Sequence, residues 1–298
     1  MLMQATPAVD RAAATGLRVR QLSDLPPLSP VAQRLLAMLT DDRVTTTALA
    51  QTIELDPGLT ARVVGLARSA FFGYAGAVYT VRDAIVRVLG LETVRSLALS
   101  LALSSQLRAG PVGGFDLPRY WGNALLTAYG ARALAPRVGA APQPSADSAY
   151  LCGLLHNLGL QAMVSVFADE MKEVFALAGA GSADDLQSAE HQVLGVDHHQ
   201  VGGWLADRWH LPPEVAVVME HHREPQYGGA YWTHARLVGV CNRLAEARMA
   251  GEPLEASEVT PSLQELRIPG QSLEEVQGLV DARLEPIREL AASLAQPG

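Results

Sequence analysis

Signals for helix boundaries recur along this chain and constrain its fold more than any other feature. Asp56-Pro57 places a capping carboxylate before a proline at the first helical position, and Thr80 to Asp83 forms a capping box. Between such signals, apolar residues recur three and four positions apart, as on the buried face of a helix. No segment shows the alternating β-branched pattern that a sheet requires. The sequence therefore predicts an all-α protein.

Glycine and proline divide the helical pattern into parts. The clearest linker is the segment AGPVGG at residues 109–114. We expect two packed helical subdomains, followed by an extension whose last helix is capped at Ser272 and runs to about Leu294. The predicted parts are a leader over 1–24, an N-terminal helical subdomain over 25–110, a second helical subdomain over 115–250 and a C-terminal helical extension over 251–298.

Composition narrows the class of protein. The chain has 298 residues and a net charge of −8, which argues against a nucleic-acid partner because phosphate neutralisation needs a basic face. The N-terminus shows no signal peptide, and no apolar run approaches the roughly 20 residues of a membrane span. Cys152 and Cys241 stand alone among apolar residues, as reduced core thiols do. We expect a cytoplasmic protein without a membrane partner.

Histidine is distributed unevenly, with all eight residues between His156 and His234. Three positions hold a histidine doublet or a histidine–asparagine pair, namely 156–157, 198–199 and 221–222. Neighbours on a helix diverge by about 100°, so one member of each pair can face a shared site. We expect His156, His198 and one of His221 and His222 to converge, as imidazoles that bind Zn²⁺ or Fe²⁺ do. The other histidines are predicted to be surface or capping residues: His191, His199, His210 and His234.

These residues carry a family resemblance. The segment GLLHNLG at 153–159 resembles the GLLHDIG signature of the HD superfamily of metal-dependent phosphohydrolases, with Asn157 in place of aspartate. The wider pattern is similar to one branch, the HDOD (HD-related output) domain, over about residues 25–225. The matching segments are LPPLSP at 25–30, DPGLT at 56–60, ARSAFFG at 67–73, AI and LG at 84–85 and 89–90, WGN at 121–123, GVDHHQVG at 195–202, WHLP at 209–212 and EHH at 220–222.

The resemblance implies which positions form the site of the HD fold, and this chain departs from the catalytic pattern there. The implied positions are Asn123, His156, Asn157, His198, His221, His222 and Asn242. Three positions filled by His, Asp and Asp in a catalytic HD protein are asparagine here. Asparagine is neutral, so the site is less able to hold a dication or activate water. We expect a degenerate site without catalytic residues or a cofactor; weak binding of Fe, Zn or Mn by His156, His198, His221 and His222 is the alternative.

HDOD proteins are bacterial signalling modules, so the resemblance implies a non-catalytic regulator that binds signalling proteins. It also implies pathways that involve cyclic di-GMP, motility or stress gene expression, and a homodimer is one option for its assembly. Two alternatives stay open: a phosphohydrolase acting on a nucleotide or cyclic dinucleotide, and a nucleotide receptor without turnover. Arg82, Arg87 and Arg95 are predicted to form a solvated helix face, with a partner-binding face as the alternative reading.

Overall fold

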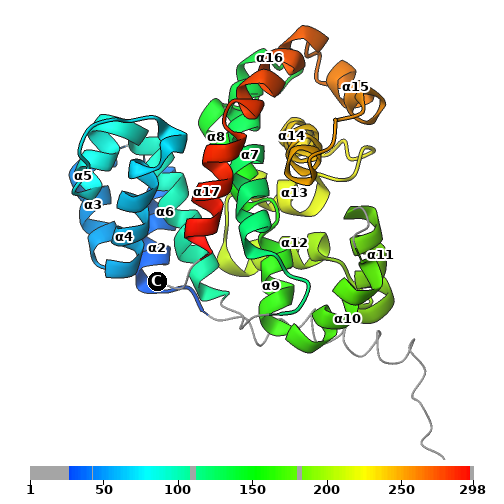
Figure 1. Cartoon of the computed structure of the whole chain (residues 1–298), viewed down its shortest axis with the longest axis horizontal. Helices are drawn as coiled ribbons and strands as arrows, with labels where there is room; N and C mark the ends of the chain where they lie inside the picture. The colour runs from blue at the N-terminus through cyan, green and yellow to red at the C-terminus, as the bar shows by residue number, and fades with distance from the viewer. Residues whose placement is uncertain (1–26, 42, 108–111, 180–182, 296–298) are drawn as a thin grey trace, which may run out of the picture.

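The computed structural model describes residues 27–41, 43–107, 112–179 and 183–295, and these form helices without a strand (Figure 1). The predicted all-α fold is therefore confirmed. The predicted leader, the first half of the linker at 109–114 and the cap expected at Ser182 lie outside the described residues.

The first group of helices follows the caps expected from the sequence. Asp56 accepts a hydrogen bond of 3.0 Å from the backbone N–H of Leu59, and Thr80 and Asp83 form the predicted capping box. Ser29 and Thr45 cap two further helices in the same way. The elements are α2 (Pro30–Ala37), η1 (Met38–Thr40), α3 (Thr46–Glu54), α4 (Pro57–Arg68), η2 (Ala70–Phe72), α5 (Val81–Asp83), η3 (Ala84–Leu89) and α6 (Leu91–Gln106).

One stretch differs from the regular helix that the sequence predicts. After three residues of α5 the backbone widens into the π-helix η3, which ends at Gly90 with φ 80°. The widened turn buries Ala84, Ile85 and Leu89 while Val86 stays exposed. The predicted solvated arginine face is also only partly right: the Arg95 side chain turns inward and donates to the carbonyl of Met38.

The long helix α7 (Leu117–Leu134) lies at the centre of the second group, where it packs against α8, α14, α16 and α17. A short η4 (Ala135–Arg137) follows it. Helices α8, α13 and α14 pack together beside α7, and α9 to α12 continue from α8 with α10 and α11 at the outer side (Figure 1). Their bounds are α8 (Ala146–Leu155), α9 (Leu158–Val166), α10 (Ala168–Ala178), α11 (Ala183–Leu194), α12 (His198–Trp209), α13 (Pro213–His221) and α14 (Trp232–Ala250).

The last helix predicted from Ser272 is wrong in its start and in its length. The segment instead forms α15 (Ala256–Glu265), α16 (Gly270–Asp281) and α17 (Leu284–Leu294). Helix α16 begins after Pro269, an extended residue that makes no side-chain cap. Because proline fixes φ and lacks an N–H, it can start a helix without a capping side chain.

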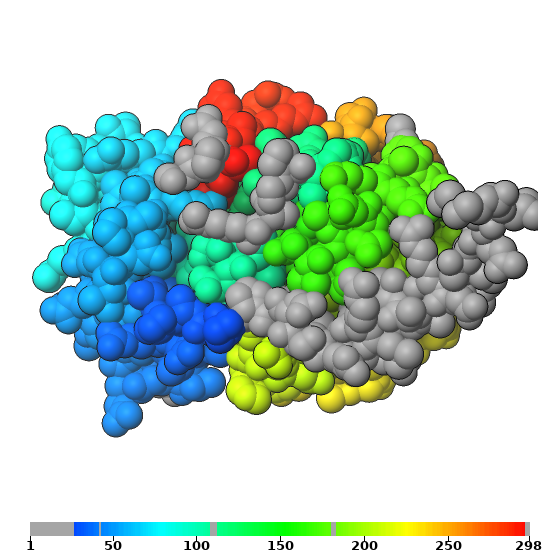
Figure 2. Space-filling view, turned by 90° about the horizontal axis from the view of Figure 1, so that it is seen from below, coloured from blue at the N-terminus to red at the C-terminus, as the bar shows by residue number. Residues whose placement is uncertain are grey.

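Helix α17 connects the two groups of helices. It packs against α7 and η2, and its red ribbon runs between the cyan and green helices in Figure 1. At its start the Arg283 guanidinium donates to the carbonyl of Phe71, and at its end Arg62 donates to the carbonyl of Leu294 at 2.8 Å. Figure 2 shows the same red segment against the cyan surface. We call α17 with Arg283 the C-terminal strap.

The described residues share one hydrophobic core that includes side chains of the strap. Among the described residues one stretch, Ala146–Val166, is long and apolar enough to cross a membrane, but 78% of its apolar 18-residue window is buried inside the protein. Core helices of water-soluble proteins have this same character, and this stretch contains α8 and α9, against which α7 and α12 pack.

Candidate functional site

Four imidazole rings lie in one buried cluster. His156 ends α8, His198 and His199 begin α12, and His222 follows α13. Ring centroids are 5.0 Å apart between His156 and His222, 4.8 Å between His222 and His199, and 4.0 Å between His199 and His198. His156 exposes 1% of its surface, His198 6%, and His199 and His222 5% each. We call them the imidazole cluster.

Two glycines allow the helices to approach closely enough to form the cluster. A Cβ atom on Gly159 of α9 would lie 2.0 Å from the backbone oxygen of His198. A Cβ atom on Gly239 of α14 would lie 2.2 Å from the backbone oxygen of His222. No larger residue fits either position without moving backbone. Gly159 therefore sets the position of His198, and Gly239 that of His222.

His156 is held as a neutral ring by two partners. Its Nδ1–H donates to the carbonyl oxygen of Gly153 at 2.7 Å, and its Nε2 accepts from the Nδ2 of Asn242 at 2.7 Å. An amide N–H can only donate, so this pairing needs the tautomer whose Nε2 is unprotonated. Burial lowers the pKa of His156 to about 4, and the positive charge of Arg223 acts in the same direction.

His198 has the opposite electrostatic character. Its Nδ1 lies 2.7 Å from Oε2 of Glu190, and the same oxygen accepts from the backbone N–H of His198. Glu190 is fully buried. Burial opposes a charge on the ring, but the attraction of Glu190 outweighs it, so the pKa of His198 is raised. The pair forms a buried imidazolium–carboxylate contact at the edge of the cluster.

The other two rings are neutral and only partly hydrogen-bonded. Nδ1 of His222 donates to the carbonyl of Val218 at 2.9 Å, and its Nε2 has no partner among the described residues. Neither ring nitrogen of His199 makes a hydrogen bond to a described residue, and Oδ1 of Asp197 lies 4.0 Å from its Nδ1. Burial, neighbouring imidazoles and the charge of Arg223 hold the pKa of both rings below the usual value. Arg223 itself pairs with Glu246 at 2.6 Å.

The structure brings together some of the predicted site residues and separates others. His156, His198, His222 and Asn242 meet, whereas His221 turns outward and stacks on Tyr227 with centroids 4.0 Å apart. The buried Oδ1 of Asn123 and that of Asn157 make no hydrogen bond within the described part of the chain.

Four further residues were not predicted from the sequence or were misplaced. His199 and His234 were predicted to be surface or capping residues, and both predictions are wrong: they expose only 5% and 7%, and Asp197 and Tyr231 are the N-cap residues of their helices. Glu190 and Arg223 were not predicted at all. The doublet at 198–199 is a signal that could have indicated His199, since it begins a helix on which both rings turn inward. His191 and His210 are exposed, as predicted.

The donors as placed do not fit a divalent cation. No group of three His, Cys, Asp or Glu side chains within the described ranges is arranged around a shared point for a metal. Nε2 of His156, the lone pair that would bind a cation, accepts from Asn242 instead. Nδ1 of His198 is engaged by Glu190, and the guanidinium of Arg223 adds positive charge beside the rings. The unpartnered ring nitrogens fit hydrogen-bonding water better than a dication.

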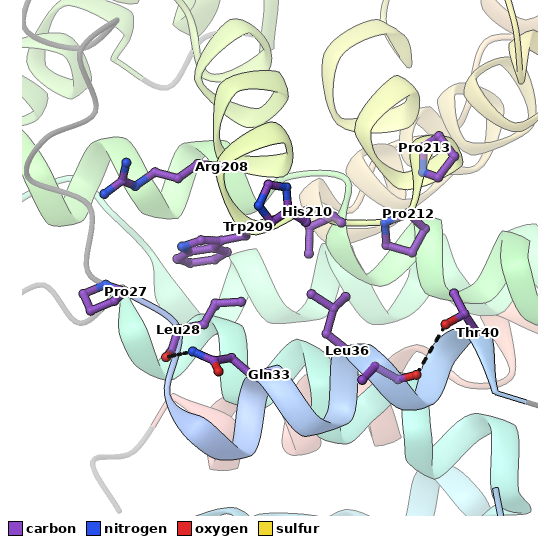
Figure 3. A pocket seen from close by; sticks show the side chains of 12 residues that line it. Pro27, Leu28, Gln33, Leu36, Thr40, Arg208, Trp209, His210, Pro212 and Pro213 are labelled. Carbon is purple, nitrogen blue, oxygen red and sulfur yellow. Dashed lines mark hydrogen bonds between the residues drawn. The ribbon is translucent and has the colours of Figure 1, made fainter.

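A separate groove of about 660 Å³ lies between α2 and the turn from α12 to α13 (Figure 3). Leu28 and Leu36 line one side, and Trp209 and Pro212 line the other. His210 adopts a left-handed backbone with φ 53° at this turn. No residue of the imidazole cluster lines the groove.

Comparison with known proteins places this arrangement in a family. Residues 25–225 match the HDOD domain. The chain belongs to the HDOD family. A protein described as uncharacterized from Treponema pallidum (strain Nichols) is 25% identical over 206 residues, which are 69% of this chain and 39% of that protein. This HDOD chain thus spans well under half of that relative.

Solved HDOD-type structures show the same fold. A protein of Marinobacter aquaeolei VT8 that is described as a signal transduction protein is 30% identical to this chain. The TM-score is 0.81, and the match covers 97% of this chain and 66% of that one. A protein of Shewanella amazonensis SB2B described as a phosphohydrolase is 26% identical, with a TM-score of 0.74 over 95% and 98%. An HDOD protein of Geobacter sulfurreducens, 22% identical with a TM-score of 0.77 over 98% and 100%, shows the fold alone.

Proposed function

We propose that this HDOD chain is a non-catalytic bacterial signal-transduction regulator that acts by binding other proteins. The observation that carries the proposal is the pairing of Nε2 of His156 with Asn242, which occupies the position a metal would need. A metal-dependent hydrolase needs an open coordination site and a bound water. Two carboxylates lie beside the cluster, Glu190 at 2.7 Å from Nδ1 of His198 and Asp197 at 4.0 Å from Nδ1 of His199, and neither lies beside Nε2 of His156 among the described residues. The Marinobacter aquaeolei relative, which is described as a signal transduction protein, supports the same class of function.

The finer parts of the proposal come from the family resemblance. They are a cytoplasmic location, a link to cyclic di-GMP, motility or stress signalling, and a homodimer as one form of assembly. The net charge of −8 favours protein partners over nucleic acid.

A metal-dependent phosphohydrolase is the rival, supported by the relative described as a phosphohydrolase. Purification of the full chain without an affinity tag, followed by elemental analysis, separates the two. We expect iron, zinc and manganese well below one equivalent, and no turnover of a cyclic dinucleotide panel. Stoichiometric metal that is lost in His156→Ala and retained in a control at the exposed His210, His210→Ala, would refute a non-catalytic role.

Nucleotide binding without turnover is the second rival, and calorimetry with the same panel tests it. We expect no heat of binding at high micromolar nucleotide. The direct test of the proposal is co-purification of the full chain from its source cells, because a regulator of this kind must have a protein partner. Absence of any stable partner at native expression would contradict the proposal.

A further inference from the structure

Five exposed residues lie near one another at the end of α4, before α5 and in α5 and η3. Tyr79 and Val86 are the two most exposed large hydrophobic residues in the described ranges, at 74% and 66%. Three exposed arginines adjoin them: Arg68, Arg82 and Arg87. We call these five residues the arginine–tyrosine patch. It lies on and beside α5 at the outer edge of the molecule, away from the helices of the imidazole cluster (Figure 1).

Contacts within the patch connect its members. The guanidinium of Arg68 lies 5.8 Å from the ring centroid of Tyr79 and donates to the carbonyl of Val78. Asp83 accepts from the backbone N–H of Tyr79 and pairs with Arg87 at 3.3 Å. Arg68, Tyr79 and Arg87 are therefore held in place before any partner arrives, which reduces the entropy lost on binding.

The backbone beneath the patch is unusual and firmly anchored. Val86 and Arg87 lie in the π-helix η3, a conformation found in well under 1% of residues and concentrated at functional sites. Val81, Ala84 and Ile85 on the opposite side of this turn are buried. The π-turn thus presents Val86 to solvent from a rigid support, although a regular amphipathic helix would bury an aliphatic residue.

The charge of the patch indicates what it can bind. The patch carries three arginines, of which Arg87 pairs with Asp83, in a chain whose net charge is −8. Arg82 has no ion-pair partner among the residues that the structure describes. Arginine and tyrosine are the residue types that concentrate binding energy at protein interfaces.

We propose that the arginine–tyrosine patch docks a partner protein through a segment in which carboxylates surround an apolar side chain. The carboxylates would pair with Arg82 and Arg68, and the apolar side chain would lie between Tyr79 and Val86. This inference rests on the proposed function, since it names the surface that such a regulator uses. A second copy of this chain and a nucleic acid are the rival occupants.

Site-specific crosslinking in source cells identifies the occupant. The full chain carries Val86→p-benzoylphenylalanine, and the matched control carries the same photoreactive group at Leu177, an exposed leucine on α10. We expect a crosslink at position 86 alone, mapping by mass spectrometry to a partner segment with net negative charge. A crosslink to nucleic acid, to another copy of the chain or to a segment without net negative charge overturns the proposal, as does no crosslink at all.

A charge exchange then tests the contact itself. We expect Arg82→Glu to weaken binding of the purified partner at least about tenfold, and Tyr79→Ala by about thirtyfold or more. Reversing a partner carboxylate to lysine should restore binding to the Arg82→Glu chain. If a partner co-purifies with the full chain and binds both variants as it binds wild type, the patch is refuted while the proposed function stands. If no partner co-purifies at all, the proposed function itself fails.

Discussion

Replacing Asn242 by aspartate tests how the imidazole cluster is held. In the native protein the Asn242 amide donates to the unprotonated Nε2 of His156 at 2.7 Å, and Asn242 is 1% exposed. An aspartate carboxylate cannot donate to that nitrogen. Near neutral pH the folded Asn242→Asp protein must therefore take up one proton, shared between the carboxylate and the ring. We expect the pKa of His156 to rise above its ordinary value.

The sign of the pH dependence distinguishes the two proteins. The native pKa of His156 is about 4 against 6.5 in the unfolded chain, so the unfolded state binds the extra proton as the pH falls below 6.5. At 1.36 kcal/mol per unit, this residue costs about 2 kcal/mol of stability at pH 5. In Asn242→Asp the folded state binds the extra proton instead. The contribution of His156 to the free energy of unfolding is then present at low pH. It is lost as the pH rises through the raised pKa of the ring, at up to about 1.4 kcal/mol per pH unit.

Urea unfolding followed by circular dichroism, at intervals from about pH 5 to about pH 8, measures the difference between the two proteins. The pH-dependent contributions of the other titrating groups are present in both proteins and largely cancel in that difference. The control Asn242→Leu removes the hydrogen bond without adding a titrating group, so it should lose stability while keeping the native pH slope. NMR titration of the ¹³Cε1 signal of His156 reports the proton directly. Equal slopes for wild type and Asn242→Asp would refute the assignment of the neutral tautomer.

Three further predictions concern packing. Gly159→Ala should lower the free energy of unfolding in urea by about 3 kcal/mol or more, because the added Cβ meets the backbone of α12. Gly65→Ala, where the Cβ meets open space, should raise it by about 0.5–1 kcal/mol. Similar losses at both sites would contradict the close approach of α9 and α12. Arg283→Ala should lower the free energy of unfolding by about 1–3 kcal/mol, because the hydrogen bond to the Phe71 carbonyl is lost. An unchanged unfolding midpoint would show that the strap does not stabilise the fold through this contact. Burial raises the pKa of Cys152 and Cys241, so neither should react with a thiol reagent at about pH 8 until urea is added; fast labelling of the native protein would disprove their burial.

Local signals predicted the helices well because they act within one turn. The caps at Asp56 and Thr80 depend on hydrogen bonds to residues three positions away, and both formed as expected. The π-turn of η3 and the start of α16 were not predictable in this way. Each depends on which side chains the surrounding helices bury, as for Ile85 and Leu273, and no spacing within the segment contains that information.

The site was predictable only as far as the family motif extends. The motif indicated His156, His198 and Asn242, and the structure joins His156 to Asn242. It gave no reason to prefer His222 over His221, since that choice depends on how α13 ends against α14. Glu190 lies on a different helix from His198, and its burial beside that ring follows from tertiary packing alone.

The C-terminal strap bears on where this chain could be cut. The family match ends at residue 225, but Asn242 and all of α17 come later in the sequence. A fragment trimmed to the match would lose the amide that holds His156 and would leave the apolar surface of α7 uncovered. The autonomous folding unit is thus larger than the segment by which relatives are recognised. Interaction screens that use isolated 25–225 fragments of this chain would sample an aggregation-prone species instead of the native protein.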